Sequence, residues 1–437
     1  MNVVSQEELA SLRIYPGTTY ATARRLIEDG HLDGWTERDG CYWQWTGRAY
    51  ERRDERALNN YLGSLLENPD VTGCDWKPTR SKVRDVIRSL TLPEVPDPDA
   101  DVLALANGLF DPISGTLVPS SPTRFVTNAL PYPYDPAATC PLWMQFLDSL
   151  WSDEPECIAM LQEWMGYLVS GRMNEQKALL MIGPTRAGKG VILRVVESLM
   201  GSEAVGALSM NNLSSWFGMQ TMVGKRLAVI GDLRIGRSLS AVAQERLLST
   251  TGEDVQNIQR KGAGLEPIDV RLRCRIMGAT NVEPQFHDAG GVLPQRFLYL
   301  RFTRSFSDHV DKSLSAKLSA ELPGILNWAL LGWRRLSDQG GFTLPASHHR
   351  VLSDVAASSS PEARFVDECC DLSDPGATTA KQLLYLAWRE WAKERGHNPG
   401  TDSQFGAALK AQFNFGVSRP RQAGERRHWA WVGVRLR

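Results

Sequence analysis

The chain has no cysteine pattern that would support a zinc site or a disulfide framework. Its seven cysteines are scattered, no C-x-x-C pair occurs, and the one close pair is the adjacent Cys369 and Cys370. Zinc motifs and disulfide-stapled folds both depend on characteristic spacings that are missing here. We therefore expect a protein with reduced thiols, as in a cytoplasm.

Long apolar runs and a secretion signal are missing too. No stretch of about eighteen uncharged apolar residues occurs, which is roughly the length that a membrane-spanning helix needs. The opening residues, MNVVSQEELA, lack a basic region followed by an apolar run, so we expect no signal peptide. No contact with a membrane is expected.

Net charge is nearly absent, but the charge is unevenly placed. Lys and Arg number 49 against 50 Asp and Glu, whereas residues 376–437 hold eleven basic and four acidic side chains. The apolar content of 42% is ordinary for a soluble globular protein, and the length allows roughly two to four domains. The basic end of the chain is a candidate for electrostatic contact with DNA.

Four short apolar runs predict the buried strands of a parallel or mixed sheet. They lie at 178–183, 226–232, 273–281 and 296–302. The segments between them are long enough for the crossover connections that parallel strands need. The fold class is therefore α/β.

Mixed structure is predicted ahead of this sheet. Residues 41–50 alternate aromatic side chains like an edge hairpin, and 107–119 place Gly and Pro between two apolar runs like a short hairpin. Residues 92–102 are rich in Pro and Asp and predict a linker. Regularly spaced Leu, Met and Trp over 141–168 predict two helices with a break near 153–155.

Helices dominate the prediction beyond the sheet. Residues 313–337 predict a helix, and the Ser- and Ala-rich segment 346–363 predicts a lead into a last domain. In that domain 380–396 and 403–413 predict amphipathic helices, and 425–437 alternate like a strand of a hairpin. Two helices followed by a β-hairpin are typical of a winged helix.

The stretch MIGPTRAGKG, residues 181–190, satisfies the pattern G-x-x-x-x-G-K. It follows an apolar strand and opens a helix that runs to Gly201, which is the context that a phosphate-binding P-loop requires. Its glycines would turn backbone N–H groups toward phosphate oxygens, and Lys189 would reach the β- and γ-phosphates of ATP. The candidate nucleotide-binding residues are Gly183, Pro184, Thr185, Arg186, Ala187, Gly188, Lys189, Gly190 and Val191.

Three more polar residues stand at strand ends in the order that a P-loop ATPase requires. Asp232 ends one strand, where a carboxylate would hold Mg²⁺, and Asn281 ends the next, where an amide would orient the attacking water. Arg296 precedes the last strand and suits an arginine finger that reaches a neighbouring subunit's site. Lys189, Asp232, Asn281 and Arg296 are the candidate catalytic residues, and Asp232 is the candidate metal ligand.

The loop departs from the usual pattern at the position after the lysine. The Ser or Thr whose hydroxyl binds Mg²⁺ is replaced by Gly190, so the metal would depend on Asp232, phosphate oxygens and water. Gly190 would also let the backbone come closer to the phosphates. No second carboxylate flanks Asp232, which leaves the general base open, with Glu253 or Asp254 as contributors from a nearby loop.

The order of these elements resembles the superfamily 3 helicases. More closely, it resembles the phage and plasmid primase-helicases related to the poxvirus-type replicative ATPase. The likeness is carried, in order over roughly residues 40–335, by YWQWTGRAYE, NGLFDPISGTLVP, CPLWMQFLDSLW, LQEWMGYLVSG, GPTRAGKG, FGMQTMVGKRLAVIGD, TGEDVQNIQRK, ATNVEP, QRFLYLRF and ELPGILNWALLGW. A loop that ends in Gly-Lys-Gly is similar to that of actinobacteriophage members, where it would be a variant of a working site.

This resemblance implies a P-loop AAA+-like core at 169–345. An α+β region at 1–95 and a helical collar domain at 96–168 would precede the core, and a winged-helix DNA-binding domain at 360–437 would follow it. The implied protein is a hexameric ring that hydrolyses ATP with Mg²⁺ and translocates on single-stranded DNA. It would act at forked DNA in the cytoplasm of the host cell, with a separate primase or polymerase as a further partner.

Two parts of the chain are implied to contact DNA. The related helicases pull single-stranded DNA with a hairpin that lies between the second and third β-strands of their core. In this chain that hairpin would be 257–267. The candidate DNA-binding residues are Arg260 and Lys261 in this hairpin, and Arg426 and Arg427 beside the predicted wing. We expect Trp429 and Trp431 to pack in the core of the wing rather than to stack on bases.

No primase activity is expected. Larger members of the resembled group carry a primase domain ahead of the helicase, and such domains need paired acidic metal ligands. The D-x-D candidates here are Asp97, Asp99 and Asp101, within the Pro-rich stretch PDPDAD. A solvated linker is the better interpretation of that composition.

Two other functions stay open beside a replicative helicase. One is a different P-loop motor, such as a packaging ATPase. The other is an origin-binding initiator scaffold that binds nucleotide with weak or no ATP turnover. The basic hairpin, Asn281 and Arg296 favour the helicase, whereas Gly190 is the main argument for the scaffold.

Overall fold

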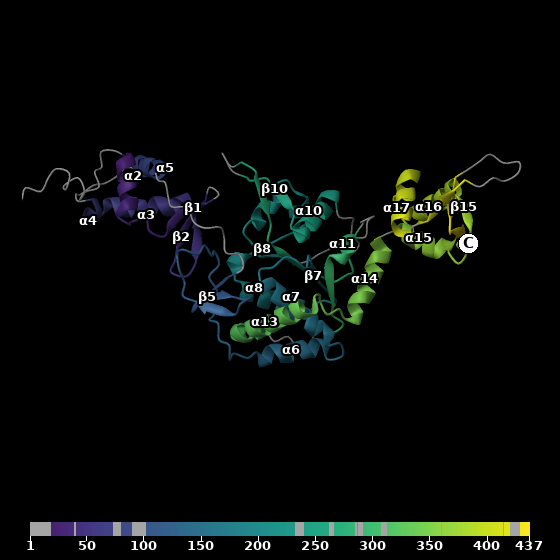
Figure 1. Cartoon of the computed structure of the whole chain (residues 1–437), viewed down its shortest axis with the longest axis horizontal. Helices are drawn as coiled ribbons and strands as arrows, with labels where there is room; N and C mark the ends of the chain where they lie inside the picture. The colour runs from purple at the N-terminus through teal and green to yellow at the C-terminus, as the bar shows by residue number, and fades with distance from the viewer. Residues whose placement is uncertain are drawn as a thin grey trace, which may run out of the picture. The chain divides into compact units, whose positions relative to one another are not determined.

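The structure is a computed structural model of the chain (Figure 1). By its internal contacts the chain divides into two compact units. The first unit comprises residues 1–138, 169–171 and 322–326, and the second comprises the rest. The structure describes residues 19–38, 41–72, 80–89, 102–231, 240–261, 266–284, 286, 292–306, 313–359, 361–413, 415–419 and 429–437. In these residues no helix has both the length and the apolar character that crossing a bilayer demands.

The first unit begins with a small helical layer and a three-stranded antiparallel sheet. Its elements are α2 (Thr19–Glu28), β1 (Trp35–Arg38), β2 (Cys41–Trp45), β3 (Tyr50–Arg53), α3 (Glu55–Glu67), α4 (Pro69–Thr72) and α5 (Arg80–Ser89). The sheet order is β1-β2-β3, so the aromatic segment expected at an edge is the central strand. The hairpin itself is confirmed, because β2 pairs antiparallel with β3. The edge position of β2 was wrong, because Trp35–Arg38, which carries little apolar pattern, pairs along the other side of β2.

A second antiparallel sheet follows in the same unit. It consists of β4 (Leu103–Leu105), β5 (Gly108–Asp111) and β6 (Thr116–Val118), in that order. The hairpin predicted at 107–119 is therefore confirmed as β5 and β6, and β4 adds a strand. The predicted linker 92–102 lies almost wholly outside the described residues.

The predicted helix pair at 141–168 is confirmed. It forms α6 (Pro141–Trp151) and α7 (Glu156–Val169), with the break where the sequence places Asp and Pro. The first turn of α6 is capped by Glu321, whose carboxylate oxygens accept hydrogen bonds from the backbone N–H groups of Leu142 (3.0 Å) and Trp143 (2.9 Å). An anion at this end of a helix is stabilised by the orphan N–H groups and the helix dipole.

Helix α13 (Leu322–Gln339) packs against α7 through a buried carboxylate and a close backbone approach. Glu163 is fully buried and accepts from Arg335 Nε (2.6 Å), Gln339 Nε2 (3.0 Å), and the N–H and hydroxyl of Thr343 (2.7 Å each). At Gly332 a Cβ atom would lie 2.2 Å from the carbonyl oxygen of Gln162, so only glycine allows this crossing.

A five-stranded, all-parallel sheet forms the centre of the second unit. The strands are β7 (Ala178–Ile182), β8 (Val205–Ala207), β9 (Leu227–Ile230), β12 (Arg275–Thr280) and β13 (Phe297–Arg301), in the order β13-β7-β12-β9-β8. All four strands predicted from apolar runs are confirmed. The short strand β8 was not predicted, because its sequence Val-Gly-Ala contains no apolar run. It joins the sheet by pairing with β9.

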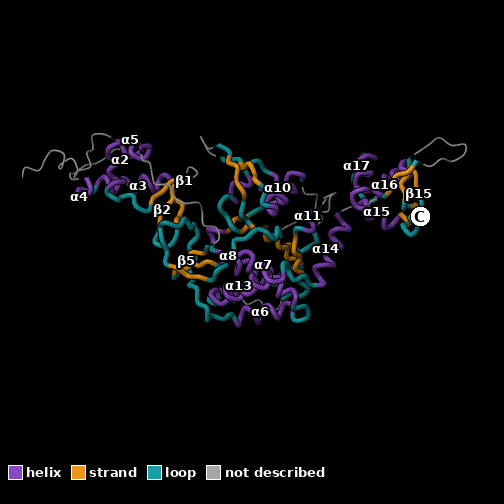
Figure 2. The backbone as a smooth tube through the Cα atoms, in the orientation of Figure 1, coloured by secondary structure: helices purple, strands orange, loops and turns teal. Residues whose placement is uncertain are grey.

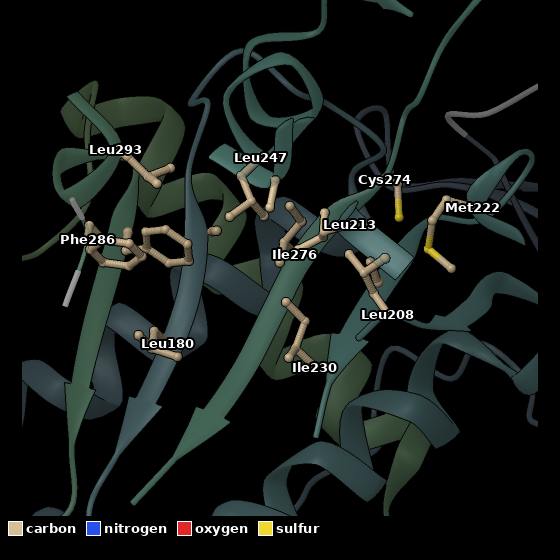
Figure 3. Close-up of a cluster of buried hydrophobic side chains, with 14 of the residues drawn as sticks. Leu180, Leu208, Leu213, Met222, Ile230, Leu247, Cys274, Ile276, Phe286 and Leu293 are labelled. Atoms are coloured by element: carbon tan, nitrogen blue, oxygen red, sulfur yellow. The ribbon is translucent and has the colours of Figure 1, made fainter. Parts of the chain in front are cut away.

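Helices and a hairpin surround this sheet (Figures 1 and 2). They are α8 (Lys189–Met200), α9 (Met210–Ser214), α10 (Ala241–Gly252), α11 (Val292–Gln295), α12 (Leu314–Ser319), α14 (Ala346–Ser359), the 3₁₀ helices η1 (Ser202–Ala204) and η2 (Gly218–Met222), and the strands β10 (Val255–Ile258) and β11 (Ile268–Arg271). Leu180, Ile230 and Ile276, from three adjacent strands, share one buried cluster with Leu213 and Leu247 (Figure 3). Burial of this kind explains why the strands read as continuous apolar runs.

The edge strand β13 is covered by α14. Its Tyr299 N–H donates to Nδ1 of His348, at 3.0 Å, so a side chain satisfies a strand group that has no neighbouring strand. The sequence predicted only a lead into the next domain here. The helical signal lay in His348, Val351 and Val355, which are spaced for one buried face among small polar residues.

The last part of the chain combines three helices with short strands. It contains α15 (Pro361–Cys369), β14 (Cys370–Asp371), β15 (Thr378–Ala380), α16 (Lys381–Glu394), α17 (Asp402–Phe413), β16 (Gly416–Ser418), β17 (Ala430–Val432) and β18 (Arg435–Leu436). The helices predicted at 380–396 and 403–413 are confirmed. Strands β15, β17 and β16 form an antiparallel sheet in that order.

The prediction of one continuous strand at 425–437 is wrong in part. A left-handed Gly433 (φ 91°) separates β17 from β18, and β18 pairs with β14 instead of continuing the same sheet. Trp431 is buried in the domain core, as expected, but Trp429 is 54% exposed. The alternation of the two tryptophans could not show that the chain turns between strands.

Candidate nucleotide site at the end of the parallel sheet

The loop between β7 and α8 has a backbone that requires its glycines. Gly183 (φ 157°) and Gly188 (φ 94°) both lie in the region that favours glycine. A Cβ atom at Gly183 would also stand 2.4 Å from the carbonyl oxygen of Phe302. The loop therefore makes a tight turn into α8 and leaves its backbone close to neighbouring segments.

Hydrogen bonds hold this loop from two sides. The N–H of Gly183 donates to the carbonyl of Thr280 at the end of β12, at 3.2 Å. On the other side, Ser305 Oγ donates to the carbonyl of Thr185 (2.9 Å), and the N–H of Phe306 donates to that of Arg186 (3.0 Å). These hydrogen bonds thus fix the loop at the carboxyl ends of the parallel strands without any contribution from a ligand.

Lys189, the first residue of α8, brings a positive charge into the loop. It is only 9% exposed, and Nζ donates to the carbonyl oxygens of Gly183 (2.6 Å) and Pro184 (2.7 Å) and to Asn281 Oδ1 (3.0 Å). Asn281 directly follows β12, whose end pairs with the end of β7. The structure therefore joins two of the four predicted catalytic residues at one point.

The other strand-end residues are placed differently. Asp232 is outside the described residues, although β9, which precedes it, runs parallel to β12 and ends at the same edge of the sheet. Over the part of the chain that the structure describes, no group of three His, Cys, Asp or Glu side chains is arranged to hold a metal ion. The predicted metal ligand accordingly stays a prediction.

Gly190 lies in the first turn of α8 with an ordinary helical backbone. It is exposed, and a Cβ atom there would meet one group, a guanidinium nitrogen of Arg194, at 3.3 Å. The backbone does not require glycine at this position. The missing hydroxyl is thus a chemical feature of the loop and not a consequence of its shape.

Arg296 lies at the end of the sheet where the parallel strands begin, whereas the loop lies at the end where they finish. It precedes Phe297, which pairs with Ala178 at the start of β7, whereas the loop follows Ile182. Along β7, four residue steps of about 3.3 Å separate these two ends of the sheet by about 13 Å. The guanidinium donates to Gln176 Oε1. The structure does not bring Arg296 to Lys189 within one chain.

The basic character of that edge is visible in a second side chain. Lys177 Nζ donates to the carbonyl of Gln295 at 2.6 Å. Burial, and next the charge of Arg296, lower the pKa of Lys177 below its ordinary value. Lys177 and Arg296 therefore place two cations at the end of the sheet that lies away from the glycine loop of the same chain.

The predicted hairpin is confirmed as the antiparallel pair β10 and β11. Ile258 pairs with Ile268, Arg260 Nε donates to the carbonyl of Glu266 (2.8 Å), and the N–H of Lys261 donates to Gln220 Oε1 (2.7 Å). The tip, 262–265, is outside the described residues. The two candidate cations thus lie at the turn end of a defined hairpin, beyond its last strand pair.

Two exposed aromatic residues near this hairpin were missed by sequence reasoning. Trp216 and Phe217 are 68% and 44% exposed, and they directly precede η2, which carries the Gln220 that binds the hairpin. Single exposed apolar side chains are ordinary, whereas contiguous exposed apolar surface can mark a binding site, and here two aromatic side chains are adjacent. The signal in the sequence was an aromatic pair within the Ser- and Gly-rich stretch SSWFG.

The second pair of candidate DNA-binding residues cannot be placed. Arg426 and Arg427 are outside the described residues. Nearby, the exposed Trp429 ring carries the guanidinium of Arg419 at 5.3 Å from its centroid. Lys381 Nζ lies 5.9 Å from the centroid of the same ring, so two cations flank this exposed aromatic face beside the predicted wing.

The fold of the chain is shared with solved structures of the C-terminal region of NrS-1. For residues 305–718 of NrS-1 two structures give TM-scores of 0.58 and 0.57, each covering 96% of this chain and 99% of the other. A third gives 0.52 and covers 90% of this chain and 94% of that one. Sequence identity is 10% in each, so the likeness shows the fold alone.

Two family descriptions and one relative match parts of the sequence. Residues 19–152 match the family described as "D5 N terminal like", and residues 181–296 match a "Family of unknown function (DUF5906)". The "Uncharacterized mitochondrial protein ymf21" of Marchantia polymorpha is 29% identical over 113 residues. That match covers 23% of this chain and 63% of the relative, so the chain spans less than two thirds of the relative's length. Residues 19–152 are thus similar to the D5 N terminal like family.

Proposed function

We propose that the chain is an ATP-driven DNA helicase of the superfamily 3 type that serves the replication of a phage or plasmid. The observation that carries this proposal is the meeting of Lys189 and Asn281 on the glycine loop. A P-loop lysine and a strand-end amide at one edge of a parallel sheet suit the hydrolysis of a nucleoside triphosphate. The strand order, with β7 between β13 and β12, suits an AAA+-like core.

The loop fits a polyphosphate. Gly183 and Gly188 keep its backbone free of side chains, and the N–H groups at the start of α8 carry positive partial charge. Lys189 would exchange its carbonyl partners for the β- and γ-phosphates. Bound ATP would supply the phosphoryl group for hydrolysis, and Asp232 with water would hold Mg²⁺, since Gly190 offers no ligand.

The position of Arg296 favours an assembly of several subunits. Its distance from the loop of its own chain leaves it no role there, whereas an arginine finger acts on the site of a neighbour. Gln176 holds the guanidinium at the sheet edge. A ring, expected to be hexameric, would bring this edge to the next subunit's loop.

Single-stranded DNA would bind along the hairpin. Arg260 and Lys261 offer cations for phosphates, and Trp216 and Phe217 offer exposed faces for bases. Proteins that bind single strands without sequence preference combine these two kinds of group.

The last domain suits contact with forked or duplex DNA. Its order of strand, two helices and two antiparallel strands, from β15 to β17, supports the proposal of a winged helix. The excess of basic residues over 376–437 supports an electrostatic role. The D5 N terminal like region adds support for a replication protein, which would work in the host cytoplasm beside a separate primase or polymerase.

ATP hydrolysis with and without single-stranded DNA, followed by strand displacement on a forked substrate, tests the proposal. We expect DNA-stimulated turnover and unwinding, both abolished in Lys189→Ala. Lys225→Ala is the matched control, because it removes an ammonium that binds the carbonyl of Glu203 at 2.6 Å, away from the loop. Nucleotide binding without turnover would favour the initiator scaffold, and turnover without displacement would favour another motor.

A further inference from the structure

Gly190 and Arg194 form an unusual pair on the first turns of α8. The two positions are four apart, so they share one face of the helix, one above the other. A Cβ atom built at Gly190 would lie 3.3 Å from Nη1 of Arg194, and apart from its two chain neighbours and the backbone of its own helix it would meet no other group within 4 Å. The guanidinium therefore occupies the space beside Gly190 that a Ser or Thr side chain would otherwise share.

The direction of this side chain points it toward the glycine loop. Helical side chains slant toward the N-terminus of their helix, and the N-terminus of α8 is the end that receives the loop. Arg194 Nε also donates to Ser315 Oγ of α12, at 3.0 Å, which steadies the guanidinium while Nη1 stays beside Gly190. The side chain is exposed, so it can be reached by a ligand at the mouth of the loop.

We propose that Arg194 contacts the phosphate oxygens of the nucleotide bound by this loop, in the space that Gly190 leaves free. The proposal rests on the proposed nucleotide site and identifies a further binding residue in it. A fixed guanidinium would neutralise phosphate charge on the side of the loop where a metal-binding hydroxyl is missing. Arginine suits this role because its planar fork matches phosphate oxygens and cannot lose its charge.

The proposal predicts how affinity depends on the metal. Without Mg²⁺, the phosphates depend on protein cations alone, so the loss of Arg194 should matter most there. A hydrogen bond to a charged group, weakened by solvent at an exposed position, corresponds to about a tenfold change in affinity. With Mg²⁺ present, the ion takes over part of the neutralisation, and the change should be smaller.

Binding of a fluorescent ADP analogue to the full chain, in EDTA and in Mg²⁺, provides the test. Arg194→Ala should weaken binding about tenfold in EDTA and clearly less in Mg²⁺. Ser315→Ala keeps the guanidinium and should bind within about twofold of the wild type. Arg350→Ala, which removes an exposed arginine of α14, is the matched control. Melting temperatures confirm that each variant is folded.

A second arm uses Gly190 itself. A side chain in Gly190→Thr would displace the guanidinium, so Arg194→Ala should have little further effect in that background. Additive losses would mean that the two positions do not share a role.

The outcomes separate the inference from the function on which it rests. The inference is overturned if Arg194→Ala binds as tightly as the wild type in EDTA while Lys189→Ala has lost binding. It is also overturned if Ser315→Ala loses as much as Arg194→Ala, because the arginine would then only join α8 to α12. If the wild-type chain binds no nucleotide, or binds it equally well without Lys189, the proposed function itself fails.

Discussion

Acidification should destabilise the second unit through a single buried histidine. His348 is 4% exposed, and its Nδ1 accepts the N–H of Tyr299, so the ring is held neutral. Burial, then the charges of His349 and Lys177, lower the pKa of His348 from 6.5 to about 4. The unfolded chain binds a proton on this ring more readily than the folded chain does.

The sign and size of the effect follow from this difference. Stability is complete above the unfolded pKa of 6.5 and falls as the pH decreases toward the folded pKa of about 4. The whole interval corresponds to about 3 kcal/mol of unfolding free energy, and about 2 kcal/mol of it is lost by about pH 5. The strand affected is β13, which supports the glycine loop at one end and Arg296 at the other.

Urea unfolding, followed by tryptophan fluorescence at about pH 8 and about pH 5, measures this loss. In His348→Asn an amide oxygen can replace Nδ1 as acceptor but cannot be protonated, so the loss between the two pH values should shrink by about 2 kcal/mol. His349→Asn, at the exposed neighbouring position, should keep most of the loss. An equal loss in the wild type and in His348→Asn would refute the reasoning.

Three further predictions follow from the packing and the assembly. Glu163→Gln should lower the unfolding free energy by about 3 kcal/mol, because it leaves a buried network without its charge; chemical denaturation measures this. Gly332→Ala should lower the melting temperature, since its Cβ would stand 2.2 Å from the carbonyl of Gln162, and an unchanged value would contradict the packing. Arg296→Ala should bind ATP but hydrolyse it slowly, and mixing it with Lys189→Ala should restore some turnover. No restoration at any ratio, in subunits shown to mix, would count against a finger acting between subunits.

The sequence predicted the strands and the helix that carry the candidate site because their signals were local. An apolar run, a glycine loop and a lysine fix β7 and the start of α8, and Asn281 follows a second apolar run. Parallel strands end at the same edge of a sheet, so the meeting of Lys189 and Asn281 follows from strand type alone once the two strands are neighbours. Which strands are neighbours depends on the tertiary structure, so the order β13-β7-β12-β9-β8 could not be taken from the sequence.

What escaped prediction depended on contacts between distant segments. Strand β8 has no apolar run of its own, and α14 hides three buried positions among Ser and Ala. The exposure of Trp216 could not be known, because an aromatic residue in a turn-rich segment is as compatible with burial as with a binding surface. In each case the side chain or strand owes its environment to a partner far along the chain.

The geometry of β13 links the nucleotide loop to the proposed finger. One end of the strand leads to Phe302, whose carbonyl and Cβ stand against Gly183, and the other begins just after Arg296. The strand is hydrogen-bonded to β7 along its whole length, and His348 binds it from the other side, so we expect displacements at its two ends to be coupled. In a ring with Arg296 acting on the next subunit, each β13 would therefore touch two nucleotide sites. A change at one loop that shifts Phe302 would then also shift the arginine presented to the neighbour, and this would give successive hydrolysis events a physical connection through a single strand.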